Sequence, residues 1–495
     1  MSKKLVLTVI DGMKPAMLER AIESGTAPTL KAIRDRGAYV DDCVAAFPSV
    51  TPVCAASIAT GTGPDRHRIP SMNWFSRAEG RYVEYGSSFS ASRKFGVLRS
   101  LTDTVYNMNA VHLAAETPTC FELLDDAGIR TAGTTYLMYR GRHEHHVTTD
   151  STLARIANAT VFRDAVKGPR ELFYADLFAS RRSGCRGQFA MPGQRDVHTG
   201  CVGAYMEEHD LYDFMLFSLP DNDTFSHRNG PAAQVTSIAA ADRQLERLVH
   251  AGGGLERFLD EHAMIVMADH SHTLVEERIR LDVAFADWQV ARPNGGRATD
   301  GEIAICPAQR SAMVYVLRDE DRAAVAARAA KVALAAPGVD LAMRLSSPRV
   351  GVIASARGEL HFSPGGDLVD LRGRRWSIDG ELAAIGGRVE DGRLLSPEYP
   401  DALGRVWSAL TCPTAGDVLL SAGPAYEFVD WGGAWHPSGG SHGSLHRSDS
   451  EGALLWCGTE GGRGWDTRDA LDQWTLRDVL PMVTDHFGLP SPAGA

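Results

Sequence analysis

Runs of apolar residues that stop at an aspartate recur along the chain. The first, LVLTVIDG, ends at Asp11, the second, DFMLFSLPDND, at Asp221 and Asp223, and the third, AMIVMADHSH, at Asp269 and His270. Short continuous apolar runs rich in Val and Ile are typical of strands that are buried on both faces of a parallel sheet. The pattern therefore predicts buried parallel strands with acidic residues at their carboxyl ends.

Segments with helical spacing of their apolar residues lie between these runs. Examples are APTLKAIRDRGA, CFELLDDAGIR and AAQVTSIAAADRQLERLVHAG. Strands that alternate with helices favour a doubly wound, mostly parallel α/β fold, in which ligands bind beyond the carboxyl ends of the strands. A single Asp after a strand is often only a loop residue or a helix cap. Three such ends, two of them with a nearby His, predict a shared site.

Residues 291–410 have a different pattern. SAMVYVLRD predicts a strand, DRAAVAARAAKVALAA an Ala-rich helix, and GELHFSPGGDLVDLRGRRWSIDGE short hairpins. We therefore expect a core made of residues 1–290 and 411–495, with an inserted smaller α+β lobe at 291–410. A second insertion, at about 74–118, carries aromatic residues that either pack in the core or wall a substrate pocket, namely Trp74, Phe75, Tyr82, Tyr85 and Phe89.

The composition is that of a soluble globular protein, with 495 residues, 44% hydrophobic residues and a net charge of −11. An acidic chain is a poor non-specific ligand for nucleic acid or for an anionic membrane, and we find neither an export signal nor a membrane-spanning apolar stretch. The eight cysteines are far apart and form no CxxC pair. We therefore expect a cytoplasmic protein with free thiols rather than disulfides or a Cys-based zinc site. The oligomeric state does not follow from the sequence.

Histidines accompany two of the strand-end aspartates. Asp223 and His227 are four residues apart, so on a helical turn they share one face and can reach one ion. Asp221 fits that geometry less well and stays a rival ligand. Asp269 and His270 are adjacent, and both can bind an ion only where the chain is irregular, as at a strand end. Taken alone, His227 could equally be a surface histidine.

The other histidines have simpler interpretations. For His272, His436 and His446 we favour a surface position or a role in supporting metal ligands. The RHEHH segment at 142–146 is typical of a solvated polar loop. His442 stands in GGSHGSLHRSDSEG, which is too poor in apolar side chains to pack a core. That segment is either a surface turn, or its glycines let the backbone close around something that His442 holds.

FPSVTPVCAASIATG places a hydroxyl at a predicted helix start. Thr51 at the N-cap and Pro52 at the first helical position begin a helix well, and that alone explains both residues. The same geometry sets a hydroxyl beside free backbone N–H groups at the positive end of a helix dipole, which suit a phosphate. Because a free threonine hydroxyl is a weak nucleophile, a coordinated metal ion would have to activate it.

Taken together, these segments resemble the alkaline phosphatase superfamily and, within it, the type I phosphodiesterase/nucleotide pyrophosphatase family. The resemblance spans residues 5 to about 445 and is carried, in the family's order, by VIDG, FPSVTPVCAASIATGTGPDRHRIP, DNDTFSHRNGP, MADHSH and GGSHGS. TPVCA lacks the CxPxR pattern of sulfatases, which disfavours that branch.

The resemblance implies two divalent metal ions at the carboxyl edge of the sheet. Zinc is expected, and the mixed Asp/His set also accommodates manganese or iron. One ion would be held by Asp11, Asp269 and His270, with Thr51 completing its coordination. The other would be held by Asp223, His227 and His442. His442 is then a metal ligand, and its glycines let the loop approach the ion.

The chain departs from the family pattern at three positions. Ser271 follows the DH pair where family members often have Gly, and Arg68 replaces the Gly of the family's HGI. The family also has an Asn, about twenty residues after the nucleophile, that contacts a phosphate oxygen. Asn73 in PSMNWF is the nearest candidate for this substrate-binding residue.

The activity that the resemblance implies is metal-dependent hydrolysis of a small-molecule phosphate ester. We expect a phosphodiesterase/nucleotide pyrophosphatase that works through a Thr51-phosphoryl intermediate and paired metal ions. A phosphomonoesterase on the same scaffold is the nearest alternative, and a phosphotransferase or mutase is a further one. A non-catalytic metal-binding protein is a more distant alternative.

Overall fold

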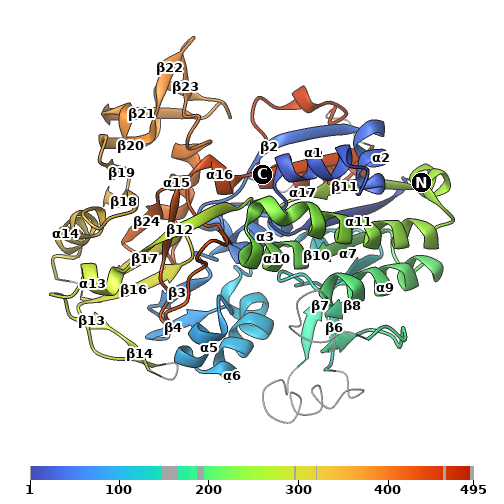
Figure 1. The fold of residues 1–495 in the computed structure, drawn as a ribbon, viewed down its shortest axis with the longest axis horizontal. Helices are drawn as coiled ribbons and strands as arrows, with labels where there is room; N and C mark the ends of the chain where they lie inside the picture. Colours follow the sequence, from blue (N-terminus) through green and yellow to red (C-terminus); the bar gives the residue numbers. More distant parts are fainter. Residues whose placement is uncertain are drawn as a thin grey trace.

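The computed structural model describes residues 2–147, 165–174, 177–186, 194–294, 297–318, 320–460 and 464–490. Its central sheet has eight strands in the order β2-β27-β11-β1-β10-β5-β8-β9 (Figure 1). The five strands β11, β1, β10, β5 and β8 run parallel. Strands β27 and β9 run antiparallel to these five, and the edge strand β2 pairs antiparallel with β27. In sheet order the bounds are Ala38–Val44, Glu451–Cys457, His262–Met267, Lys4–Ile10, Phe214–Leu219, Thr131–Gly133, Glu171–Tyr174 and Phe178–Ala179.

Helices cover both faces of this sheet, as the alternating pattern predicts. On β1, Leu5, Leu7 and Val9 belong to one hydrophobic cluster, whereas Val6 and Ile10 belong to another, because successive side chains of a strand point to opposite faces. The first cluster includes residues of α3 (Thr51–Thr60), α7 (Cys120–Asp126) and α17 (Val479–His486). The second includes residues of α1 (Pro15–Glu23), α2 (Pro28–Arg36), α9 (Arg195–Glu208) and α11 (Gln234–Ala251). The fold is doubly wound.

A second sheet of ten strands forms a smaller lobe, at the left of Figure 1, with α14 packed against it. The strand, the Ala-rich helix and the hairpin predicted there are β17, α14 and the antiparallel pair β20–β21. The lobe consists of β13 (Val290–Ala291), β16 (Ile303–Ala308), β17 (Ser311–Val316), α14 (Arg322–Leu334), β18 (Val339–Ser347), β19 (Val350–Ser355), β20 (Gly358–Asp370), β21 (Arg375–Gly380), β22 (Arg388–Glu390), β23 (Arg393–Leu395) and β24 (Val418–Ala422). Because β24 lies beyond residue 410, the sheet is not confined to the predicted insertion, and the domain division stays a prediction.

The segment after α3 folds into a hairpin followed by helices. Its elements are α4 (Pro64–His67), β3 (Asn73–Ser76), β4 (Arg81–Glu84), α5 (Phe89–Phe95), α6 (Val97–Thr102) and the π-helix η1 (Asp103–His112). Four of its five singled-out aromatic residues are buried, and Phe89 is 74% exposed. Trp74 and Phe75 also line a cavity of about 900 Å³. The role of that cavity as a substrate pocket stays a prediction.

The histidine-rich segment RHEHH differs from the expected solvated loop. His143–His145 form β6, which pairs antiparallel with β7 (Val166–Gly168). His145 is buried, and its Nε2 lies 2.7 Å from the carbonyl oxygen of Pro169. A partner strand more than twenty residues away therefore gives this polar segment a structural role.

The expectation of no disulfide is wrong at one pair. Cys185 and Cys201 are bonded, with their Cα atoms 5.8 Å apart, because α9 brings Cys201 beside a segment that lies 16 residues earlier. The other six cysteines are free and buried. The expected cytoplasmic location stays a prediction. Within the described residues, no helix has both the length and the apolar character that a membrane crossing requires.

The remaining elements are short or belong to the site described below. They are α10 (Asp221–Asn229), η2 (Pro231–Ala233), α12 (Leu255–Glu261), β12 (Thr273–Ile279), α13 (Leu281–Ala284), β14 (Pro293–Asn294), β15 (Arg297–Ala298), η3 (Leu382–Ile385), α15 (Ala402–Leu410), β25 (Ala425–Phe428), β26 (Gly440–Ser441), α16 (Arg447–Ser450), η4 (Arg468–Ala470) and η5 (Leu476–Asp478).

Candidate metal centre

Three strand ends bring the predicted aspartates to one edge of the central sheet. Asp11 directly follows β1, Asp223 lies in the first turn of α10 just after β10, and Asp269 follows β11. These three strands are parallel neighbours, so their carboxyl ends lie at the same edge. The structure thus places all three carboxylates where an α/β fold binds its ligands.

His270 connects one group of these residues. Its Nε2 lies 3.3 Å from Asp11 Oδ1, 3.6 Å from Asp269 Oδ2 and 3.2 Å from Thr51 Oγ1. Asp269 Oδ1 accepts the backbone N–H groups of Gly12 and His270, each at 3.1 Å, which fixes this carboxylate. The four residues that the family resemblance assigns to one ion therefore lie together.

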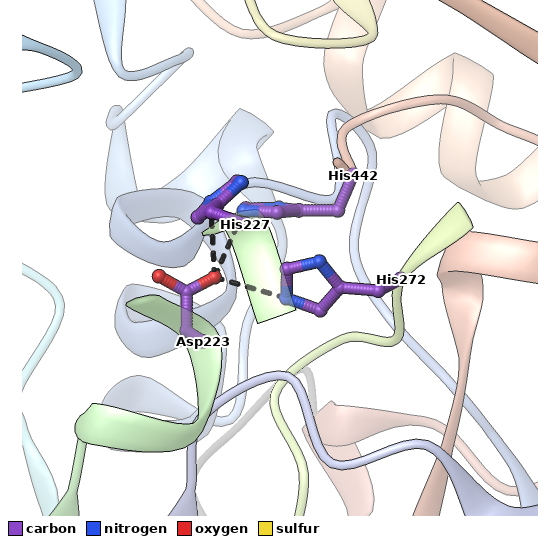
Figure 2. Close-up of side chains that lie close together, drawn as sticks. All are labelled: Asp223, His227, His272 and His442. Carbon is purple, nitrogen blue, oxygen red and sulfur yellow. Dashed lines mark hydrogen bonds and ion pairs between the residues drawn. The ribbon is translucent and has the colours of Figure 1, made fainter. Parts of the chain in front are cut away.

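Asp223 connects the second group, shown in Figure 2. Its Oδ1 lies 3.2 Å from the Nε2 of His227, one turn later on α10, and 3.4 Å from the Nε2 of His442, which follows β26. The Nε2 of His272, just before β12, lies 3.0 Å away. Asp223 also has a carboxylate oxygen within 4.8 Å of ligand atoms of Asp11 and His270, so it belongs to both groups.

His272 is fully buried beside Asp223, so the surface position considered for it is wrong, and its role in supporting a metal ligand stays a prediction. Its position two residues after His270 was an available signal, because side chains i and i+2 of an extended chain point to the same side. Among the other candidates, Asp221 accepts hydrogen bonds from Arg195 Nε and from the N–H of Asp196 through its two carboxylate oxygens. Its carboxylate is therefore engaged outside the cluster. His436 pairs with Glu427, and His446 pairs with Glu398.

The loop that carries His442 approaches the cluster closely. A Cβ at Gly440 would lie 2.9 Å from His272 Nδ1 and 2.8 Å from Ser226 Oγ, so only glycine fits there. The loop backbone thus lies close to His272 and Ser226 at this position, and its approach to a bound ion stays a prediction. His442 itself is fully buried rather than in a surface turn.

Backbone carbonyls set the tautomers of three histidines. The Nδ1 atoms of His227, His442 and His270 lie 2.7, 2.8 and 3.1 Å from the carbonyl oxygens of Gly440, Ser49 and Ser271. A carbonyl oxygen can only accept, so each Nδ1 carries a hydrogen, and in the neutral form of each ring the lone pair is on Nε2, which faces the carboxylates. This is how metal-binding histidines are usually held.

Burial and charge shift the pKa values of these groups strongly. Burial, and then the negative charges of Asp269 and Asp223, raise the pKa of Asp11 well above its usual value. Burial favours the neutral form of His270, but Asp269 and Asp11 outweigh it and raise its pKa to about 10. Burial and the neighbouring His270 lower the pKa of His442 to about 4. The cluster thus holds mutually repelling carboxylates beside a neutral imidazole.

This arrangement fits bound cations. Within the described residues, Asp11 Oδ1 and His442 Nε2 are buried and make no hydrogen bond. Imidazole lone pairs and carboxylate oxygens that face one another repel unless a positive charge lies between them. Mixed Asp/His donors are ligands of zinc, and also of manganese and iron.

Thr51 lies at the start of α3, one position further into the helix than expected. Val50 is the N-cap, and the Thr51 hydroxyl contacts His270 instead of capping the helix. Pro52 has no N–H, and the N–H groups of Val53 and Cys54 both donate to the Val50 carbonyl. In the described structure no hydrogen bond engages the Thr51 N–H, so this single group is available to a phosphate oxygen, rather than the several predicted.

Asn73 is buried in the β3–β4 hairpin. Its Nδ2 donates to the carbonyl oxygen of Val83 at 3.1 Å and to Glu84 Oε2 at 3.0 Å. Both amide hydrogens are thereby used, and its Oδ1 cannot donate to a phosphate oxygen. The predicted phosphate contact would require the amide to leave these partners, and it stays a prediction.

Comparison with known proteins bears on the identity of this centre. The family model for type I phosphodiesterase/nucleotide pyrophosphatase matches residues 5–384. None of the curated proteins matches the chain in sequence. Murine ectonucleotide pyrophosphatase/phosphodiesterase 5 has a similar structure, with a TM-score of 0.60 at 11% identity over 100% of this chain and 97% of that one. An inactive variant of the murine protein, in complex with AMP, gives 0.59 at 11% identity over the same shares.

A bacterial structure is also similar. Phosphonoacetate hydrolase from Sinorhizobium meliloti, in complex with phosphonoformate, gives a TM-score of 0.56 at 18% identity over 98% of this chain and 96% of that one. At such identities these likenesses show the fold alone, which is that of the alkaline phosphatase superfamily. The predicted fold class is confirmed.

Proposed function

The chain belongs to the type I phosphodiesterase/nucleotide pyrophosphatase family, and on this basis we propose that it hydrolyses small-molecule phosphate diesters or pyrophosphates with Thr51 as the nucleophile. One observation carries the proposal. The Thr51 hydroxyl stands at a helix start, 3.2 Å from His270 Nε2, beside a buried cluster of carboxylates and imidazoles. A hydroxyl that only capped a helix would not need this position.

Two divalent cations complete the proposed site. Asp11, Asp269 and His270 would hold one, and Asp223, His227 and His442 the other. Zinc is proposed, with manganese or iron as alternatives. Bound there, the cations supply positive charge that lowers the pKa of a hydroxyl or a water molecule and offsets the charge of a phosphate group.

The chain's own residues carry out the remaining parts of the proposed reaction. Thr51 Oγ1 attacks phosphorus as its hydroxyl proton passes to solvent water. The bond from phosphorus to the leaving oxygen breaks, that oxygen takes a proton from water, and the phosphoryl group is transferred to Thr51. Water then cleaves the new bond and restores the hydroxyl. The free N–H of Thr51 binds a phosphoryl oxygen, next to the attacking atom, at the positive end of the α3 dipole.

The test combines metal analysis with a panel of phosphoesters. The purified protein is assayed for bound zinc, manganese and iron, and then with bis-p-nitrophenyl phosphate, p-nitrophenyl phosphate, a nucleoside triphosphate and phosphonoacetate. We expect bound metal and a higher kcat/KM for the diester than for the monoester.

Other outcomes of this panel have definite meanings. Faster turnover of the monoester would make the protein a phosphomonoesterase, and transfer to an added alcohol would make it a phosphotransferase. Metal-loaded protein that is inactive on every substrate would overturn the proposal and leave a non-catalytic metal-binding protein.

A further inference from the structure

Three imidazole rings surround one carboxylate oxygen in the Asp223 group. The ring centroids of His227, His272 and His442 are 5.0, 5.1 and 5.2 Å apart in their three pairings, so the rings stand at nearly equal spacing. Each points its Nε2 at Asp223 Oδ1, as Figure 2 shows. Three nitrogens and one oxygen that converge in this way match the donor set of a four-coordinate zinc site.

We propose that His272 is a fourth protein ligand of the cation at Asp223. The family resemblance gives that ion only three protein ligands, and the inference rests on the proposed function only in requiring that a cation binds there. The Nε2 of His272 lies 3.0 Å from Asp223 Oδ1, as near as the corresponding atoms of His227 and His442 at 3.2 and 3.4 Å.

The surrounding chain holds His272 in this position. The side chain is fully buried, and a Cβ at Gly12 would lie 2.5 Å from its Nε2, so the glycine after Asp11 makes room for the ring. Lys14 Nζ donates to the His272 carbonyl oxygen at 3.2 Å and to the Ser448 carbonyl oxygen at 3.1 Å. These contacts attach the backbone at His272 to the segment that follows the His442 loop.

The alternative role for His272 is a hydrogen bond to Asp223 without contact to the ion. The two roles make opposite demands on a replacement. Gln reaches about as far as His and donates from its amide nitrogen, but it is a poor metal ligand. Glu reaches as far and can bind a cation through its carboxylate, but it cannot donate to Asp223. His272→Gln and His272→Glu therefore separate the two roles.

A four-ligand set also predicts that the protein binds the two ions with different affinities. The ion at Asp223 would have four protein ligands and no need of an outside one. The ion at Asp11, Asp269 and His270 would have a position for Thr51 or for a phosphate oxygen. Closed four-ligand sites are typical of tightly held ions, and open sites of reactive ones. A chelator should therefore remove the two ions at different concentrations.

The experiment measures Zn²⁺ binding to metal-free protein in competition with a chromophoric chelator. Wild type should retain one ion at chelator levels that remove the other. Loss of a residue that only supports a metal ligand weakens metal binding by roughly 10- to 100-fold. His272→Gln should lose at least that much affinity for the retained ion. His272→Glu should bind this ion more tightly than His272→Gln does. His250→Gln, at an exposed histidine near the end of α11, is the control and should match wild type.

X-ray absorption of wild-type protein with one equivalent of Zn²⁺ gives a test that needs no variant. Three imidazoles per ion are expected, and two or fewer would overturn the inference. Full affinity in His272→Gln together with weak binding in His272→Glu would also overturn it, in favour of the hydrogen-bonding role. Wild type that binds no ion would overturn this inference and the metal part of the proposed function. Wild type that binds as expected but hydrolyses no phosphoester would refute the proposed function alone.

Discussion

Thr51 Oγ1 lies 3.2 Å from His270 Nε2, although 219 residues separate the two in sequence. α3 places the hydroxyl at its first residue, and the segment after β11 places the imidazole at the carboxyl end of the sheet. The contact joins the candidate nucleophile to the carboxylate cluster, since the same Nε2 lies 3.3 Å from Asp11 Oδ1. The site is therefore assembled by the packing of α3 on the sheet.

Thr51→Ala removes the proposed nucleophile and leaves the carboxylates and imidazoles in place. We expect kcat to fall by roughly 10⁴-fold or more, because a reaction that proceeds through a covalent intermediate loses its route with the nucleophile. Metal content, measured by elemental analysis, should stay near that of wild type. Thr51→Ser is the matched control and should keep a substantial part of the rate. Unchanged turnover in Thr51→Ala would remove the nucleophile assignment.

Asp223→Asn should weaken metal binding more broadly than His227→Gln does. Asp223 has ligand atoms in both groups of the centre, whereas His227 belongs to one. We expect Asp223→Asn to lower the affinity for both ions, and His227→Gln to lower it for one. Titration of metal-free protein with Zn²⁺ measures both affinities. Equal effects of the two changes would contradict a shared role of Asp223.

Metal removal should destabilise the folded protein. Buried carboxylates and imidazole lone pairs face one another at the site, and a ligand that binds only the folded state adds stability by mass action. At about 100 times its Kd, one ion adds ~2.7 kcal/mol. Thermal unfolding with and without a chelator measures this effect, and added Zn²⁺ should restore the midpoint. The Asp223→Asn variant serves as control, because its midpoint should respond much less to the chelator.

Glu84 should make stability fall as pH rises from about 4.5 to about 7. Burial raises the pKa of this carboxyl from 4.5 to about 7 in the folded protein. Between those values the unfolded chain has released a proton that the folded protein keeps, so the free energy of unfolding decreases with pH, by on the order of 3 kcal/mol in total. Above about pH 7 this contribution no longer changes.

Glu84→Gln tests this prediction, because the amide does not titrate. Urea unfolding at several pH values should show a flatter dependence between pH 5 and 7 in the variant than in wild type. The absolute stability of the variant is not the readout, since Glu84 also accepts hydrogen bonds from Asn73 and from the N–H of Ser87. Parallel curves for the two proteins would show that Glu84 is ionised in the fold at neutral pH.

Much of the fold and of the site follows from local pattern. The apolar runs before Asp11, Asp223 and Asp269 are buried parallel strands, because only strands covered on both faces exclude polar residues so completely. The four-residue spacing of Asp223 and His227 brings them together on one helical turn, as it would in any helix. Such features depend on residues a few positions apart, and the amino-acid order contains them.

Other features depend on segments that meet only in the folded chain. The Cys185–Cys201 bond, the pairing of β24 with the lobe and the Asn73–Glu84 contact each have a partner that no local spacing identifies. His272 is the clearest example of a residue whose contacts only the tertiary structure decides. Its identity is plain in the sequence, but its closeness to Asp223 requires β11 to lie near α10 and Gly12 to leave room for the ring. Residue type thus limits the chemistry that is possible, and long-range packing selects which side chains share one centre, because the distances that govern coordination are set between elements and not along the chain.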